Sequence, residues 1–101
     1  MMAMDSQHVI ETLRSHQKEL QAAGIAHLRV FGSVARGEAS SSSDIDLLAD
    51  FDQSKQLTLV KIGSLQNLLS GILGANVDLS SFEWLREPVR SKANHEAILA
   101  F

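Results

Sequence analysis

The most constraining feature of this sequence is the segment at residues 44–51 (DIDLLADF), in which acidic and apolar residues alternate at its start. A period of two predicts a β-strand, because successive side chains of a strand point to opposite faces of the sheet. One face of this strand is apolar and carries Ile45, Leu47, Ala49 and Phe51. The opposite face carries Asp44, Asp46, Leu48 and Asp50. We therefore expect a sheet with one face covered by helices and the other face polar.

Helix-like and strand-like segments alternate along the rest of the chain. Apolar residues at helical spacing predict helices at residues 6–23, 57–73 and from 83 or 86 to 100. Further strands are predicted at residues 25–31 and 76–79, a short helical piece at 33–36 and a loop at the serine run 40–43. This order predicts an α/β (α+β) fold, in which helices pack on one face of a small mixed sheet of three to four strands.

Length, cysteine content and charge limit the class of protein. A chain of 101 residues predicts one domain over residues 1–101, and the absence of Cys excludes disulfides and thiolate zinc sites. The net charge of −3 argues against a broad basic surface for nucleic acid. The apolar runs are too short for a membrane span and the first residues lack the signal-peptide pattern, so we expect a cytoplasmic protein.

Three aspartates are expected to meet on the uncovered face of the sheet. Asp44 and Asp46 share one strand face, and Asp78 points away from the face of Val77 and Leu79 on the last predicted strand. Residues two apart on a strand have Cα atoms about 6.5–7 Å apart, so their carboxylates can share a metal ion. Gathered like charges are unfavourable unless a cation neutralises them or a pKa rises. Oxygen ligands without Cys or His favour Mg²⁺ or Mn²⁺, although Asp-x-Asp alone is also typical of a solvated face.

A Gly-Ser dipeptide lies where the strand at 25–31 meets the short helical piece. Gly32 allows the backbone to approach a phosphate closely, and a helix N-terminus presents N–H donors there. Ser33 adds a hydroxyl and Arg36 adds a planar cation suited to phosphate oxygens. Standing alone, the dipeptide is more typical of a tight turn with a capping serine.

The two motifs together resemble those of a known enzyme superfamily. GSVARG at residues 32–37, followed after the serine run by SDIDLL at 43–48, is similar to the signature of the nucleotidyltransferases that include polymerase β. The resemblance is closer to the MNT-type minimal nucleotidyltransferases, which are antitoxins beside HEPN ribonuclease toxins. It covers nearly the whole chain and implies a polymerase-β-like nucleotidyltransferase fold.

This resemblance implies the transfer of a nucleoside monophosphate, usually AMP from ATP, to a hydroxyl of the HEPN toxin partner. Asp44 and Asp46 would hold two Mg²⁺ ions, with Mn²⁺ as an alternative, and Asp78 would bind the catalytic ion and accept the acceptor's proton. Gly32, Ser33 and Arg36 would bind the triphosphate of ATP or another nucleoside triphosphate.

Two other functions stay open at this point. One is a binding module that neutralises a toxin by occlusion, and the other is a nucleotidyltransferase acting on a small molecule or an RNA end. The chain has one Trp, four Phe and no Tyr, so much of the acceptor site is expected from another chain. Surplus apolar residues such as Leu59 and Ile62 suit such a partner interface, and a homo-oligomer also stays open.

Overall fold

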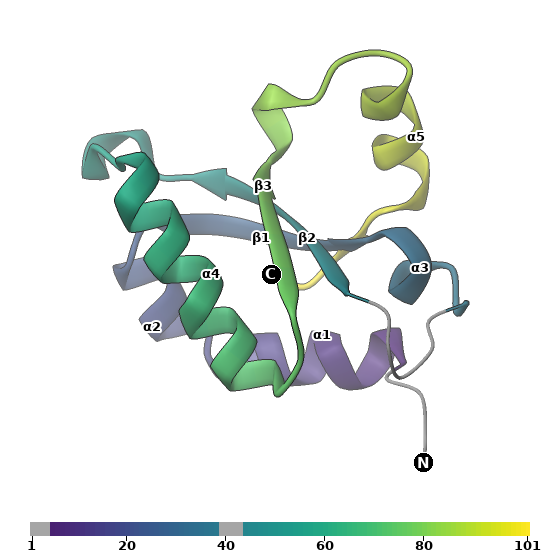
Figure 1. Ribbon diagram of the computed structural model, residues 1–101, viewed down its shortest axis with the longest axis horizontal. Coiled ribbons are helices and arrows are strands. Elements are labelled where there is room, and N and C mark those ends of the chain that lie inside the picture. Colours follow the sequence, from purple (N-terminus) through teal and green to yellow (C-terminus); the bar gives the residue numbers. More distant parts are fainter. Residues whose placement is uncertain (1–4, 39–43) are drawn as a thin grey trace.

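A four-stranded mixed sheet with the order β3-β2-β1-β4 forms the centre of the protein (Figure 1). The computed structural model describes residues 5–38 and 44–101, so the predicted loop at 40–43 lies outside the described residues. The strands are β1 (Ile25–Phe31), β2 (Ile45–Phe51), β3 (Val77–Ser81) and β4 (Ile98–Leu99). β2 pairs antiparallel with β1 and parallel with β3, while β4 pairs antiparallel with β1. The predicted mixed α/β sheet is confirmed.

Three helices cover one side of this sheet and enclose the core. They are α1 (Ser6–Ser15), α2 (Gln17–Ala22) and α4 (Leu59–Leu73), which Figure 1 shows beneath and in front of the strands. Three of the four residues predicted on the apolar face of β2, Ile45, Leu47 and Ala49, are at most 1% exposed, and the fourth, Phe51, is half-buried against the core. They pack with Val9, Leu13, Leu20 and Leu69 from the three helices. No helix in the described ranges combines the length and hydropathy needed to cross a bilayer.

The predicted first helix is two helices that meet at His16. The backbone of His16 leaves the helical region, with φ −107° and ψ 12°. The hydroxyls of Thr12 and Ser15 donate to the carbonyls of His8 and Thr12, at 2.8 and 2.6 Å. Such side-chain bonds compete with the helical backbone and bend helices, which the apolar spacing alone does not reveal.

The predicted last helix is shorter than expected at both ends. Residues Phe82–Trp84 form a 3₁₀ turn (η2), and the helix itself, α5, spans Val89–Glu96. Residues Ile98–Leu99 are not helical because they pair with β1 as β4, and the N–H of Ala100 donates to the carbonyl of Leu28 at 2.8 Å. This pairing satisfies backbone groups of β1 that would otherwise lie at an open sheet edge.

The polar side of the sheet is covered in part by α5, which Figure 1 shows on the side of the strands opposite α1. Leu48 points to this side and is only 3% exposed, and Ala93 of α5 is completely buried. The expectation of helices on a single face therefore holds for α1, α2 and α4, and α5 departs from it. The carboxylates predicted to gather lie at the starts of β2 and β3, before the position of Leu48 along β2.

The exposed edge of β3 is blocked by two side chains of α4. Gln66 Oε1 accepts the N–H of Leu79 at 3.0 Å, and Ser70 Oγ accepts the N–H of Val77 at 3.1 Å. These N–H groups would otherwise be available to pair with a strand of another chain. These two N–H groups at the edge of β3 are therefore satisfied without pairing to a further strand.

Replacing Gln66 by Ala is expected to lower the free energy of unfolding by about 1–3 kcal/mol, because the part-buried N–H of Leu79 loses its acceptor. Urea unfolding measures this change. Asn67→Ala removes a similar amide side chain at the next position of the same helix, which is exposed, and it is the matched control. An equal loss in both variants would contradict a specific role of Gln66.

Candidate active site

Asp46 lies at the centre of the predicted site because of its register in the sheet. It is the Cα partner of Phe31 on β1 and of Asp78 on β3. Adjacent strands lie about 4.8 Å apart, so the side chains of Asp46 and Asp78 are neighbours on the polar side of the sheet. Asp44 immediately precedes β2 and is exposed, as is Asp78. The topology thus places all three predicted acids at one end of β2 and β3.

Gly32 brings the backbone of the following turn directly against Asp46. β1 ends at Phe31, and the short helix α3 (Gly32–Ala35) begins with a glycine at φ +75°. A Cβ atom built on Gly32 would lie 3.2 Å from Cγ of Asp46 and would overlap its Oδ2. Only glycine satisfies both the left-handed backbone and this close approach.

The pKa of Asp46 reports on its burial and on the acids around it. Its pKa is raised above the ordinary value, chiefly by burial and then by the charges of Asp78 and Asp44, while Arg36 opposes the rise. The ionised form of Asp46 therefore lacks sufficient compensation from the protein itself. A divalent cation would supply that compensation, and hard carboxylate oxygens are the donors that Mg²⁺ or Mn²⁺ prefers.

The carboxylates fit a metal site by composition and position. In residues 5–38 and 44–101, no three His, Cys, Asp or Glu side chains converge to hold an ion as they stand. Asp44 and Asp78 are exposed, so neighbouring side chains do not lock their rotamers. The roles assigned to these acids from the sequence stay predictions.

α3 fixes Ser33 and Arg36 beside the acids. Val34 of this helix is 1% exposed and belongs to the core, so the short helix is held by packing. Arg36 directly follows α3, and its positive charge acts to lower the pKa of Asp46. Its guanidinium also faces two carboxylates, with Nε 3.0 Å from Oε2 of Glu38 and Nη1 3.6 Å from Oε2 of Glu96.

Neither ion-pair partner of Arg36 was predicted from the sequence. Closeness in the chain, two residues, was the only sign of Glu38, and Glu96 gave none because it is the last residue of α5. A further carboxylate of the polar face, Asp50, pairs with Arg29 on β1 at 2.9 Å. The guanidinium of Arg29 also lies 4.8 Å from the ring centroid of Phe82. The ion pair of Arg29 with Asp50 lies on the same face as the candidate site. Asp50 is therefore not one of the acids expected to gather there.

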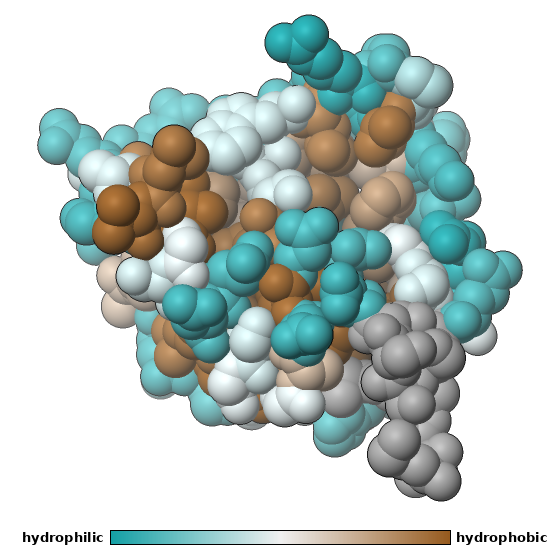
Figure 2. Space-filling model, in the orientation of Figure 1, coloured by the Kyte–Doolittle hydropathy of each residue, from teal (hydrophilic) through white to brown (hydrophobic). Residues whose placement is uncertain are grey.

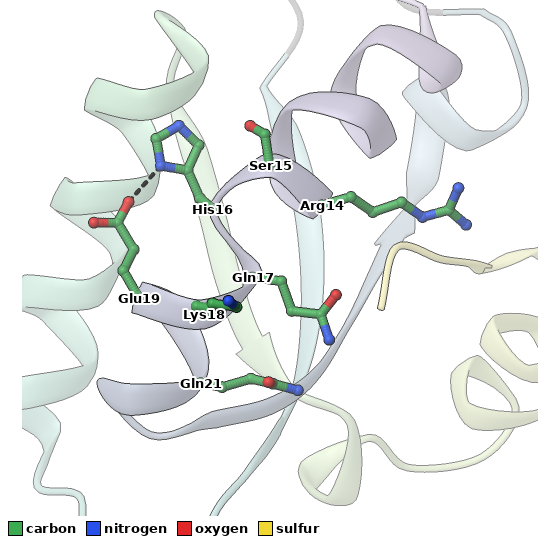
Figure 3. A pocket seen from close by; sticks show the side chains of 7 residues that line it. All are labelled: Arg14, Ser15, His16, Gln17, Lys18, Glu19 and Gln21. Atoms are coloured by element: carbon green, nitrogen blue, oxygen red, sulfur yellow. Dashed lines mark hydrogen bonds and ion pairs between the residues drawn. The ribbon is translucent and has the colours of Figure 1, made fainter.

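A surface hollow of about 700 Å³ lies elsewhere, at the break between α1 and α2. Figure 3 shows its side chains, which are Arg14, Ser15, His16, Gln17, Lys18, Glu19 and Gln21. They diverge, since His16 turns to Glu19 while Arg14 extends away and donates to the carbonyl of Ala100 at 2.6 Å. Both helices lie on the side of the sheet opposite the acids, so this hollow is separate from the candidate site.

The structure therefore places a glycine-serine turn against Asp46, which lies beside Asp78 in a mixed sheet. The sequence matches the nucleotidyltransferase domain family over residues 10–100, and the chain belongs to this family. It is therefore a nucleotidyltransferase enzyme, and members of the family generally use divalent metal ions.

Individual relatives resemble nearly the full chain. The protein adenylyltransferase MntA of Thermococcus cleftensis is 36% identical over 99 residues, which span 96% of this chain and 98% of that protein. A solved structure of a candidate minimal nucleotidyltransferase is 39% identical, with a TM-score of 0.70 over 94% of this chain and 95% of that chain. A toxin–antitoxin crystal structure with AMP-PNP has the same fold, with a TM-score of 0.69 at 18% identity over 97% of this chain and 73% of that chain.

Proposed function

We propose that this protein is a Mg²⁺-dependent protein adenylyltransferase, which transfers AMP from ATP to a hydroxyl of a HEPN-type toxin and acts as its antitoxin. The observation that carries the proposal is the register of Asp46 beside Asp78, with Gly32 packed against its carboxylate. The activity named for the Thermococcus cleftensis relative and the toxin–antitoxin assembly with AMP-PNP support the choice of nucleotide and partner.

The proposed reaction is an attack of the acceptor oxygen on the α-phosphorus of ATP. The new oxygen–phosphorus bond forms as the bond from the α-phosphorus to the bridging β-phosphate oxygen breaks, and pyrophosphate leaves. Asp78 accepts the proton of the acceptor hydroxyl. The hydroxyl of Ser33 and the guanidinium of Arg36 bind the triphosphate, and Gly32 allows it to approach the backbone.

Asp44, Asp46 and Asp78 would hold the divalent ions. When bound, such ions neutralise the phosphate oxygens and favour the deprotonated acceptor. The raised pKa of Asp46 supports this assignment, because burial and then the charges of Asp78 and Asp44 disfavour its ionised form, which a bound cation would stabilise. The backbone of Asp46 is fixed by strand pairing on both sides, which sets where its carboxylate starts on the polar face.

An exposed apolar surface on α4 supports a protein partner. Leu59 and Val60 begin this helix and are 78% and 80% exposed. Figure 2 shows apolar side chains gathered over this end of α4, at the upper left of the view. Exposed apolar patches of this kind mark interaction surfaces, whereas Ile62, the other predicted interface residue, is half-buried against the core.

Incubation of the protein with ATP labelled at the α-phosphate, Mg²⁺ and a purified HEPN-type toxin is expected to place the label on the toxin. Mass spectrometry of the toxin should find AMP added to a hydroxyl side chain. ATP labelled at the γ-phosphate is the matched control, and it should leave the toxin unlabelled because pyrophosphate departs.

Three other outcomes would contradict the proposal. Neutralisation of the toxin without label transfer would identify the protein as a binding module. Label transferred to a small molecule or an RNA end, with the toxin unlabelled, would assign a different acceptor. Transfer that persists after chelation of divalent ions would remove the metal from the mechanism.

A further inference from the structure

Arg36 is held by two carboxylates that come from different parts of the chain. Glu38 engages Nε at 3.0 Å from the turn after α3, and Glu96 faces Nη1 at 3.6 Å from the last residue of α5. A guanidinium carries five N–H donors in a fixed planar fork, so two carboxylates on Nε and Nη1 restrict its orientation and leave further donors for a phosphate oxygen.

Glu96 occupies a position that is unfavourable for an acidic side chain. It is the last residue of α5, where the helix dipole disfavours negative charge. Its Oε2 is buried and has no hydrogen-bond partner within reach among the described residues. Arg36 is the cation that faces this oxygen. A buried carboxylate oxygen at a helix C-terminus is thus kept beside one specific arginine.

We propose that Glu96 is a positioning residue, which orients the guanidinium of Arg36 toward the triphosphate and ties α5 to the nucleotide site. This inference rests on the proposed function, since it assigns to Arg36 the binding of the nucleotide. Glu38 belongs to the same turn as Arg36 and its side chain is 65% exposed, whereas that of Glu96 is 30% exposed. Glu38 makes the shorter contact, a hydrogen bond to Nε, and Glu96 adds a longer ionic contact from a separate element, so Glu96 is the carboxylate that fixes the arginine relative to α5.

The test compares Glu96→Gln, Arg36→Ala, the double variant and Glu83→Gln, each measured for the KM for ATP, kcat and the Kd of a non-hydrolysable ATP analogue. Glu96→Gln is expected to raise KM and Kd by about 3–10-fold with kcat nearly unchanged, because it weakens orientation in the ground state and transition state alike. Combined with Arg36→Ala it should add no further loss. Glu83, in the described part of the chain, is exposed and forms no ion pair with Arg36, so Glu83→Gln is the matched control and should change KM by less than about 2-fold. Thermal melting of each variant reports whether the fold is intact.

The outcomes separate this inference from the proposed function. If Glu96→Gln raises KM by the same factor with and without Arg36, Glu96 acts through the general structure and the inference is overturned. Unchanged nucleotide binding in Glu96→Gln, while Arg36→Ala weakens it, also overturns the inference alone. A wild-type protein that binds no ATP analogue in the presence of Mg²⁺ overturns the proposed function, and the inference with it.

Discussion

Replacing Asp46 by Asn is expected to abolish nucleotidyl transfer and, at the same time, to raise the melting temperature of the metal-free protein. Transfer should fall by about 10³-fold or more, because a charged group at the reacting centre is lost. Burial, and then repulsion from Asp78 and Asp44, raises the pKa of Asp46, and removal of the charge relieves both. The gain in the free energy of unfolding should be about 0.2–1 kcal/mol, as expected for partly solvated like charges.

The gain in stability of Asp46→Asn depends on pH in a defined direction. The pKa of Asp46 is raised in the folded state, so the folded protein binds more protons than the unfolded chain between the ordinary carboxyl pKa and the raised value. Stability of the wild-type protein therefore falls as pH rises through this window. The advantage of the Asn variant should be present at neutral pH and disappear in acid. Mg²⁺ should raise the melting temperature of the wild-type protein and have less effect on the variant.

Asp52→Asn is the matched control, because the pKa of Asp52 is shifted in the opposite direction. Hydrogen bonds from the hydroxyl and the N–H of Ser54, at 2.7 and 3.0 Å, lower the pKa of Asp52. Its ionised form stabilises the fold above the ordinary carboxyl pKa, and this contribution is lost as pH falls. Asp52→Asn should therefore lower the melting temperature at neutral pH and leave transfer intact. If both variants are destabilised alike, the gathered acids are not a source of repulsion.

Gly32→Ala is expected to impair folding and transfer together. An L-residue at φ +75° costs about 1–2 kcal/mol, and the added methyl group meets Asp46 in a packed environment, which raises the total to about 2–4 kcal/mol. The turn or the carboxylate must shift to relieve the contact. A displacement of about 1 Å at a reacting centre lowers the transfer rate by about 10²-fold. Urea unfolding and initial rates of label transfer measure the two effects.

Gly37→Ala separates backbone strain from the contact with Asp46. Gly37 has a similar φ of +74°, and no described atom lies within 4 Å of the position of its added Cβ. In this variant the free energy of unfolding should fall only by the cost of backbone strain, about 1–2 kcal/mol, and transfer should be retained. Gly32→Ala should also cost less stability in an Asp46→Ala background, where the opposing carboxylate is gone. Equal losses for Gly32→Ala in both backgrounds would show that the close approach has no energetic consequence.

Much of the fold was predictable from short-range patterns. The alternation at residues 44–51 placed Ile45 and Leu47 in the core and Asp46 on the opposite face, as the structure confirms. Helical spacing likewise located α4, which begins after the capping hydroxyl of Thr58 and ends at Gly74 with φ 67°. These features follow from the geometry of single elements, which local sequence encodes directly.

The features that were missed depend on contacts between distant segments. The fourth strand forms because residues 98–99 lie beside β1, where a ladder of backbone bonds replaces the predicted last turn of α5. The break at His16 depends on side-chain bonds of Thr12 and Ser15, and α5 reaches the polar side of the sheet only through the path of the chain after β3. The periodic patterns of the local sequence do not encode these contacts between distant segments.

The candidate residues were recognisable before folding, because a glycine-serine turn and strand aspartates appear as residue types at fixed spacing. Which of them become neighbours depends on the folded chain. The parallel register of β2 and β3 sets Asp46 beside Asp78, and the meeting of α3 with α5 sets Glu96 beside Arg36. The physical reason is that side-chain type and strand face are local properties, whereas charge interactions and close packing depend on distances that only the folded chain establishes.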